Sequence, residues 1–165
     1  MLGSVLIVAV SMFAGGIFLI FVDKWFDRPE NENTRISYRK ALIIGLFQII
    51  SIIPGISRSA ATIIGGMSQK LSRKNAAEFS FFLAVPTMFA ASVLKLTENY
   101  KLFNGQDIKI LLVGNIVSFL VALLAIKTVI TFLTNHGFKA FGYYRIIVGL
   151  ILLVLILLGR NLTVF

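Results

Sequence analysis

The chain has 165 residues, of which 58% are apolar and only 14% are charged, and its mean hydropathy is +0.91. Soluble domains carry about 25% charged residues, so this composition excludes an ordinary soluble domain and predicts an integral membrane protein. The net charge of +9 does not indicate a nucleic-acid-binding protein, because the basic residues lie in short connectors between apolar runs. Since the sequence has no cysteine, disulfides and thiolate metal sites are also excluded.

Apolar runs along the chain predict four transmembrane helices. A hydrocarbon core about 30 Å thick requires about 20 helical residues. The predicted spans are, in chain order, about residues 2–22, 76–96, 110–133 and 144–158. Small residues in the first span predict that another helix packs closely against it.

The connectors predict how these spans are oriented and where one of them begins. Connectors 23–40, 67–76 and 134–145 carry ten Lys and Arg residues, which places 23–40 in the cytoplasm by the positive-inside rule. Asn75 and Glu78 resemble a capping box, with Asn75 as the N-cap of the second span.

Residues 41–66 are apolar but interrupted by Pro54-Gly55. The break leaves two parts of about 13 residues, and each reaches only about 20 Å as a helix, so neither part can span the bilayer alone. The pattern leaves two shapes open: one broken transmembrane helix, or a re-entrant hairpin that returns to the side it came from. Irregular backbone at membrane depth requires surrounding protein or a water-filled cavity.

Arg58 lies directly after this break, and an arginine inside a membrane is costly enough to indicate function. Ser57, Ser59 and Thr62 surround it, and a helix restarting after the break offers unpaired backbone N–H groups to an anion. Together these groups predict a phosphate-binding clamp. Gln48, on the entering half, can face the same cavity.

Structural explanations remain open for these residues. Arg58 can lie in a hydrated surface loop or pair with a carboxylate of another helix, and Ser and Thr in membrane helices commonly serve packing. His136 and Glu78 are weaker candidates, a solvated loop residue and a helix cap respectively. The sequence shows no paired carboxylates, metal cage or Ser-His-Asp set.

The motif PGISRSAATI at 54–63 resembles the undecaprenyl-diphosphatase family, the bacitracin-resistance proteins of bacterial inner membranes. Further matches cover most of the chain after residue 36: YRKALIIGLFQ at 38–48, AAEFSFFLAVP at 76–86, VALLAIKT at 121–128 and YRIIVG at 144–149. The resemblance implies hydrolysis of undecaprenyl diphosphate to undecaprenyl phosphate and phosphate, which recycles the lipid carrier for cell-wall synthesis. It implies catalytic roles for Arg58, Ser57 and Ser59 and substrate-binding roles for these three residues, Thr62 and Gln48.

The same resemblance implies a part that this sequence does not contain. Family members carry an N-terminal half with a Glu-rich motif, a proposed serine nucleophile and a histidine, whose carboxylates are associated with a divalent cation, Mg²⁺ or Ca²⁺. We therefore expect a chain that resembles the C-terminal portion, supplies the phosphate-binding half, requires the missing N-terminal half and is inactive alone. A homodimer is left open.

The expected architecture is one all-α membrane domain, residues 1–165, with four transmembrane helices and a re-entrant hairpin at 41–66, about half of an inverted-repeat fold. Its expected partners are the polyprenyl diphosphate substrate and membrane lipids. Two other functions remain open. A polyprenyl-phosphate carrier or flippase would use the same clamp without a nucleophile, and a non-catalytic structural fragment would need no substrate.

Overall fold

The computed structural model describes residues 5–26, 36–100 and 105–158, and within these ranges every regular element is helical. The elements are α1 (Val5–Phe26), α2 (Tyr38–Ile49), the short 3-10 helix η1 (Ile50–Ile52), α3 (Arg58–Ser68), α4 (Arg73–Asn99), α5 (Gly105–His136) and α6 (Lys139–Leu157). By length and composition α1, α4, α5 and α6 can each cross a membrane. The prediction of an all-α multi-pass membrane protein with four such helices is confirmed.

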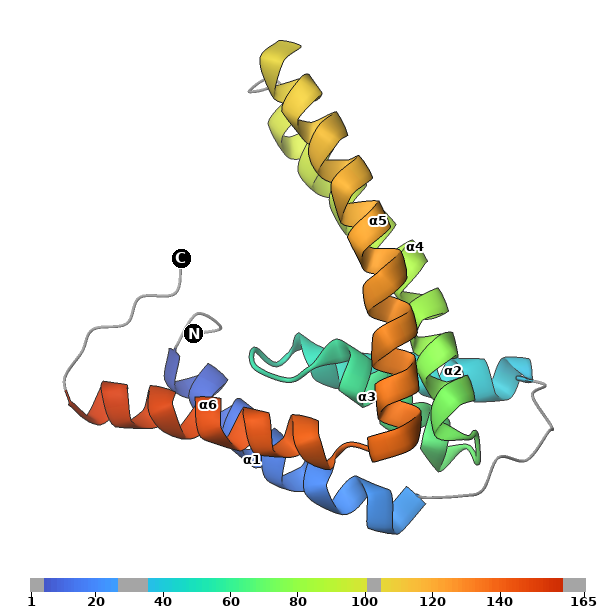
Figure 1. Cartoon of the computed structure of the whole chain (residues 1–165), viewed down its shortest axis with the longest axis vertical. Coiled ribbons are helices and arrows are strands. Elements are labelled where there is room, and N and C mark those ends of the chain that lie inside the picture. The colour runs from blue at the N-terminus through green and yellow to red at the C-terminus, as the bar shows by residue number, and fades with distance from the viewer. Residues whose placement is uncertain (1–4, 27–35, 101–104, 159–165) are drawn as a thin grey trace.

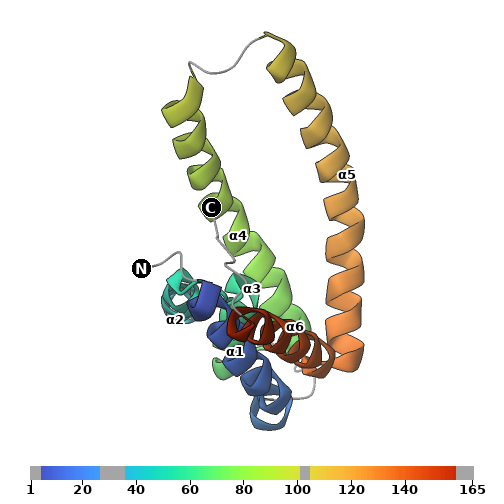
Figure 2. The same ribbon diagram turned by 90° about the vertical axis from the view of Figure 1, so that its left-hand side faces the viewer.

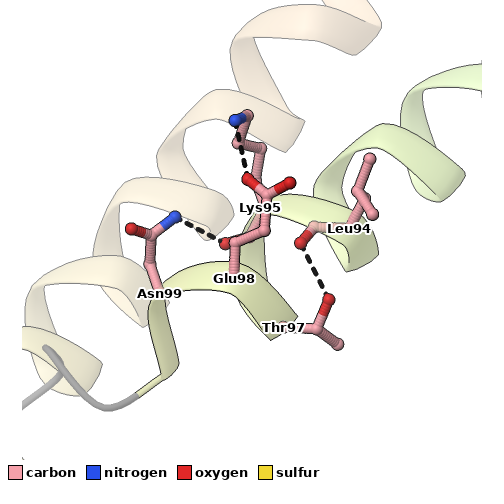
Figure 3. Close-up of polar contacts among 5 residues, drawn as sticks. All are labelled: Leu94, Lys95, Thr97, Glu98 and Asn99. Atoms are coloured by element: carbon pink, nitrogen blue, oxygen red, sulfur yellow. Dashed lines mark hydrogen bonds and ion pairs between the residues drawn. The ribbon is translucent and has the colours of Figure 1, made fainter.

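The helices form two unequal parts. Helices α1 and α6 lie side by side near the short helices α2 and α3, whereas α4 and α5 extend far beyond them as a long pair (Figures 1 and 2). At the distant end of α4, Lys95 forms an exposed ion pair with Glu98 at 2.8 Å (Figure 3). Only 6% of the most apolar 18-residue segment of α4, and 6% of that of α5, is buried inside the structure. Most of the surface of these two helices is therefore exposed.

Glycines allow α1 and α6 to approach each other. A Cβ atom on Gly16 of α1 would lie 2.8 Å from the carbonyl oxygen of Gly142 in α6. One on Gly149 would lie 2.8 Å from the backbone nitrogen of Phe13. These distances are shorter than real side chains allow, so the close helix contact predicted from the small residues of the first span is confirmed at Gly16.

The break at Pro54-Gly55 is confirmed. Gly55 has a φ of +91°, and a Cβ atom there would lie 2.6 Å from the carbonyl oxygen of Val8 in α1, so only glycine fits. Helices α2 and α3 pack against each other, with Gly65 directly beside the ring of Phe47. Their 12 and 11 residues correspond to about 18 and 17 Å. Both helices are thus too short to span, while their re-entrant placement and the inverted repeat stay predictions.

Helix α3 is the most enclosed element. Its residues from Ala61 to Met67 are all buried, and α3 contacts α1, α2 and α4. Ile63, Ile64 and Met67 join a core with residues of several helices: Leu19, Val22, Ile44, Leu71, Ala76, Ala77, Leu133 and Phe138. This core holds the start of α3 at a fixed place among the longer helices.

The start of α4 differs from the prediction. Ser72 is its N-cap, with Oγ accepting a hydrogen bond of 3.2 Å from the N–H of Asn75, and the helix begins at Arg73. The predicted cap at Asn75 is wrong because a serine three residues earlier already provides the capping oxygen. Asn75 is therefore the third residue of the helix.

Asp23 differs as well, since it was assigned to a polar connector in water. It lies in the last turns of α1, is only 8% exposed, and accepts a hydrogen bond of 2.8 Å from the N–H of Phe138. Its other oxygen lies 3.2 Å from a guanidinium nitrogen of Arg73. Asp23 therefore joins α1 to the start of α4 and to the connector between α5 and α6.

Candidate functional site

The candidate site is built on the first residues of α3. Ser57 is the N-cap, and its Oγ accepts a hydrogen bond of 3.3 Å from the N–H of Ala60. The hydroxyl of Ser59 lies 3.1 Å from the same Oγ. Two hydroxyls and the first N–H groups of a helix thus lie together at the break, as the sequence predicts.

Arg58 points from this site toward α4. Its Nη1 donates a hydrogen bond of 3.1 Å to Thr87 Oγ1, and the Thr87 hydroxyl in turn donates to the carbonyls of Leu83 and Ala84. In the part of the chain that the structure describes, Arg58 forms no ion pair. The guanidinium therefore donates to a neutral oxygen, and no described carboxylate compensates its charge.

Thr62 and Gln48 form no hydrogen bond with the hydroxyls of Ser57 and Ser59 among the described residues. Thr62 is 1% exposed, and its hydroxyl lies 2.6 Å from that of Ser80 in α4 while bonding the carbonyls of Arg58 and Ser59. The backbone carbonyl of Gln48 accepts a hydrogen bond from Ser51, and its half-buried side chain lies on α2. Thr62 therefore fastens α3 to α4, and binding roles for Thr62 and Gln48 stay predictions.

Two cavities meet at this site. The smaller, about 230 Å³, lies among α1, α3, α4, α5 and α6 and is lined by both serine hydroxyls, Ser57 and Ser59. The larger, about 440 Å³, lies among α1, α2, α3 and α6 and is mostly apolar, although Ser57 also lines it. Four residues line both cavities: Leu19, Ser57, Ala60 and Arg145.

Arg145 is the residue that the sequence analysis missed. It was counted with connector 134–145, but it lies in the second turn of α6, and its Nη2 donates a hydrogen bond to the carbonyl oxygen of Gly55. That carbonyl belongs to the same break that begins α3. An arginine in the motif YRIIVG, inside an apolar helix, is the signal that could have found it.

The family resemblance implies a divalent cation, which needs several carboxylate or imidazole ligands close together. Within the described ranges no three His, Asp or Glu side chains are grouped in this way. Asp23, the buried acid, is already engaged by Arg73 and Phe138. The described residues of this chain therefore do not fit such a cation, and no chemical step is derived through one.

Four long apolar helices, a helix break between them and two arginines beside that break define a multi-pass membrane protein with a cationic polar site. A family model described as "Bacitracin resistance protein BacA" matches residues 1–151. The chain belongs to this family.

Relatives that are similar to this chain carry the name undecaprenyl-diphosphatase, and three of them serve as examples. The protein of Flavobacterium johnsoniae is 59% identical over 153 residues, which cover 90% of this chain and 58% of the relative. That of Porphyromonas gingivalis is 59% identical over 172 residues (99% and 60%), and that of Aquifex aeolicus is 48% identical over 153 residues (92% and 60%). The chain therefore spans about three fifths of the length of the relatives it matches.

Proposed function

We propose that this chain carries the phosphate-binding part of an enzyme that hydrolyses undecaprenyl diphosphate to undecaprenyl phosphate and phosphate. One observation carries the proposal: Arg58, without a described acidic partner, lies at a helix start beside two hydroxyls 3.1 Å apart. The names of the relatives supply the reaction and the lipid.

In this proposal the site acts by binding and charge stabilisation. The Arg58 guanidinium stabilises the negative charge on the oxygens of the transferred phosphoryl group, and the hydroxyls of Ser57 and Ser59 donate hydrogen bonds that fix its orientation. Ser57 Oγ accepts a hydrogen bond from Ala60 and lies 3.1 Å from the Ser59 hydroxyl, so one of the two hydroxyls donates to the other and the remaining hydroxyl hydrogen can point at a ligand oxygen. Neither hydroxyl is given a role as nucleophile.

The setting of the reaction is part of the same proposal. A substrate with a long isoprenoid chain requires a membrane site, and four membrane-crossing helices provide one. We place the protein in the bacterial inner membrane, where recycling of the lipid carrier supports cell-wall synthesis and bacitracin resistance. The remainder of the family architecture is its required partner.

A polyprenyl-phosphate carrier is the second candidate. It is favoured by the composition of the site, because the described residues near Ser57 offer binding groups without a neighbouring carboxylate or histidine to activate a nucleophile. A carrier needs only such a binding site.

Reconstitution in liposomes tests the two functions against each other. Purified chain is assayed for phosphate release from undecaprenyl diphosphate, first alone and then with the part of the Porphyromonas gingivalis relative that it does not cover. We expect no release from the chain alone and release from the combination. Transfer of undecaprenyl phosphate between leaflets with no release in either sample would instead establish the carrier.

A further inference from the structure

Arg145 carries a charge that the described structure does not compensate. Its guanidinium donates a hydrogen bond to the neutral carbonyl oxygen of Gly55, and within the described residues it has no ion pair. Its Nε is buried and has no hydrogen-bond partner among the described atoms. A partly buried guanidinium that keeps unused donors inside an apolar helix pair is unfavourable unless an anion joins it.

The position of Arg145 gives such an anion a place to bind. Arg145 lines both cavities, and so does the N-cap residue Ser57, whereas Arg58 lines neither of them. The smaller cavity adds the hydroxyl of Ser59. Arg145 therefore lines the same cavity as Ser57 and Ser59, whereas Arg58 donates a hydrogen bond to Thr87 of α4.

The larger cavity continues from this cation into apolar surroundings. Except for Ser11, Ser57 and Arg145 its lining residues are apolar or glycine, and they include the following large side chains: Val10, Phe18, Leu19, Phe47, Ile50, Ile53, Ile56 and Ile64. A volume of about 440 Å³ is in the range of small-ligand pockets. A cation in the lining of an otherwise apolar cavity matches an amphiphile with an anionic head.

We infer that Arg145 is a second anion-binding residue, which holds a phosphate group of a prenyl phosphate while the prenyl chain enters the cavity between α1, α2 and α3. The phosphate takes the unused donors of Arg145 together with the hydroxyl of Ser57. The prenyl identity of the chain rests on the proposed function, whereas the anion site rests on the geometry alone.

Inorganic pyrophosphate is the probe for the anion site. Binding to the purified 165-residue chain is measured by titration calorimetry in a neutral detergent, so that no lipid anion competes. We expect Arg145→Gln to weaken binding at least tenfold. Arg145→Lys should also weaken it, since lysine keeps the charge but loses the planar fork. Lys139→Gln is the matched control, because it removes the same charge from an exposed position of the same helix, and it should change binding less than twofold.

A second variant distinguishes a loss of anion binding from a loss of folding. A Cβ atom on Gly15 would lie 3.0 Å from Arg145 Nη2, so Gly15→Ala displaces the guanidinium while keeping its charge, and we expect weaker binding with an unchanged helical circular dichroism spectrum. Wild-type binding by folded Arg145→Gln, or an equal loss in Lys139→Gln, would overturn the anion site.

Farnesyl diphosphate tests the chain-binding cavity. The wild-type chain should bind it at least tenfold more tightly than pyrophosphate. Ala14→Phe, which fills the larger cavity, should remove this gain and leave pyrophosphate binding unchanged. Ile17→Phe, on the exposed side of α1 and outside both linings, is the control. Equal affinity of the wild-type chain for both probes would refute the prenyl assignment.

The outcome is independent of the hydrolysis assay. If Arg145 binds pyrophosphate but the reconstituted protein releases no phosphate, the proposed function fails and the anion site stands. If phosphate is released while Arg145→Gln leaves binding intact, the proposed function stands and this inference fails.

Discussion

The carboxylate of Asp23 accepts a hydrogen bond of 2.8 Å from the backbone N–H of Phe138, 115 residues later in the chain. The same carboxylate pairs with Arg73 at 3.2 Å. Gly137, which precedes Phe138, has a φ of +69°, and a Cβ atom on it would overlap Asp23 Oδ2. The backbone of this connector is therefore shaped around the carboxylate, and one side chain fixes the relative positions of α1, α4 and α6.

Asp23→Ala should lower the free energy of unfolding by about 2 kcal/mol, because it removes the acceptor of the buried Phe138 N–H and one interaction of the Arg73 guanidinium. Asp23→Asn should cost less, since an amide oxygen can still accept from Phe138. Thermal unfolding of the purified chain in detergent, followed by circular dichroism, measures both. Glu98→Ala is the control. It breaks an exposed ion pair and should shift stability by about 0.5 kcal/mol or less. Equal melting temperatures for Asp23→Ala and Glu98→Ala would contradict the conclusion that the buried contacts of Asp23 stabilise the fold.

Gly149→Ala should weaken the contact between α1 and α6. The added methyl group would lie 2.8 Å from the Phe13 nitrogen and 3.1 Å from the Ala9 carbonyl oxygen, both backbone atoms that cannot move aside locally. Gly114→Ala in α5 provides the comparison, because nothing lies within 4 Å of its Cβ position. Alanine there should be neutral or stabilising by up to about 1 kcal/mol through helix propensity. Melting temperatures that fall for Gly149→Ala and hold for Gly114→Ala would support the close packing, and the reverse order would exclude it.

In the proposed hydrolysis, Arg58→Lys should be nearly as harmful as Arg58→Ala. Lysine retains the charge but loses the planar fork, whose Nη1 donates to Thr87 while the remaining N–H groups are available to a phosphate. In the reconstituted assay we expect kcat/KM to fall at least about tenfold, or roughly 1.4 kcal/mol of transition-state stabilisation. Arg39→Lys, an exposed substitution at the start of α2, should have no effect. A lysine variant with wild-type kinetics would reduce the role of Arg58 to that of a point charge.

The re-entrant placement of α2 and α3 predicts that both ends of this segment face the cytoplasm. Single cysteines at Tyr38 and Lys70, both exposed, test this in a sequence without cysteine. A membrane-impermeant thiol reagent added to intact cells should label neither position, and permeabilised cells should show both labelled. A cysteine at Glu98, at the opposite end of α4, should react in intact cells. If only one of Tyr38 and Lys70 reacts from outside, the segment is a broken transmembrane helix.

The break in residues 41–66 could be predicted because its causes are local. Proline lacks the backbone N–H that a helix requires, and glycine reaches the positive φ of +91° that Gly55 adopts. The cap of α3 follows from the same reasoning, since Ser57 precedes a helical run. Composition likewise predicts the number of long apolar helices, because each span depends on its own residues only.

The contacts of Arg145 and Asp23 could not be predicted in this way, because their partners are distant in sequence, although the apolar surroundings of Arg145 in YRIIVG indicate that it is an unusual residue. Each lies near the predicted boundary of a span, where a charged residue is normally solvated, and only the contacts with Gly55 and Phe138 show otherwise. The direction in which the Arg58 side chain points could not be predicted from the sequence either. Thr87 is one of several threonines that bond their own helix, and nothing in its local sequence indicates that Arg58 donates to it.

The enclosure of α3 sets an order for membrane insertion. Ala61 to Met67 are buried on a helix that contacts α4, yet α4 is synthesised after α3. In the re-entrant placement, α2 and α3 together would expose the Arg58 guanidinium to lipid if they entered the bilayer first, which is strongly unfavourable. If the placement is re-entrant, we expect the short helices to remain at the membrane surface or within the insertion machinery until Thr87 and Ser80 of α4 are available to bond Arg58 and Thr62. The site would then be completed late in biogenesis, by helices that follow it in the chain.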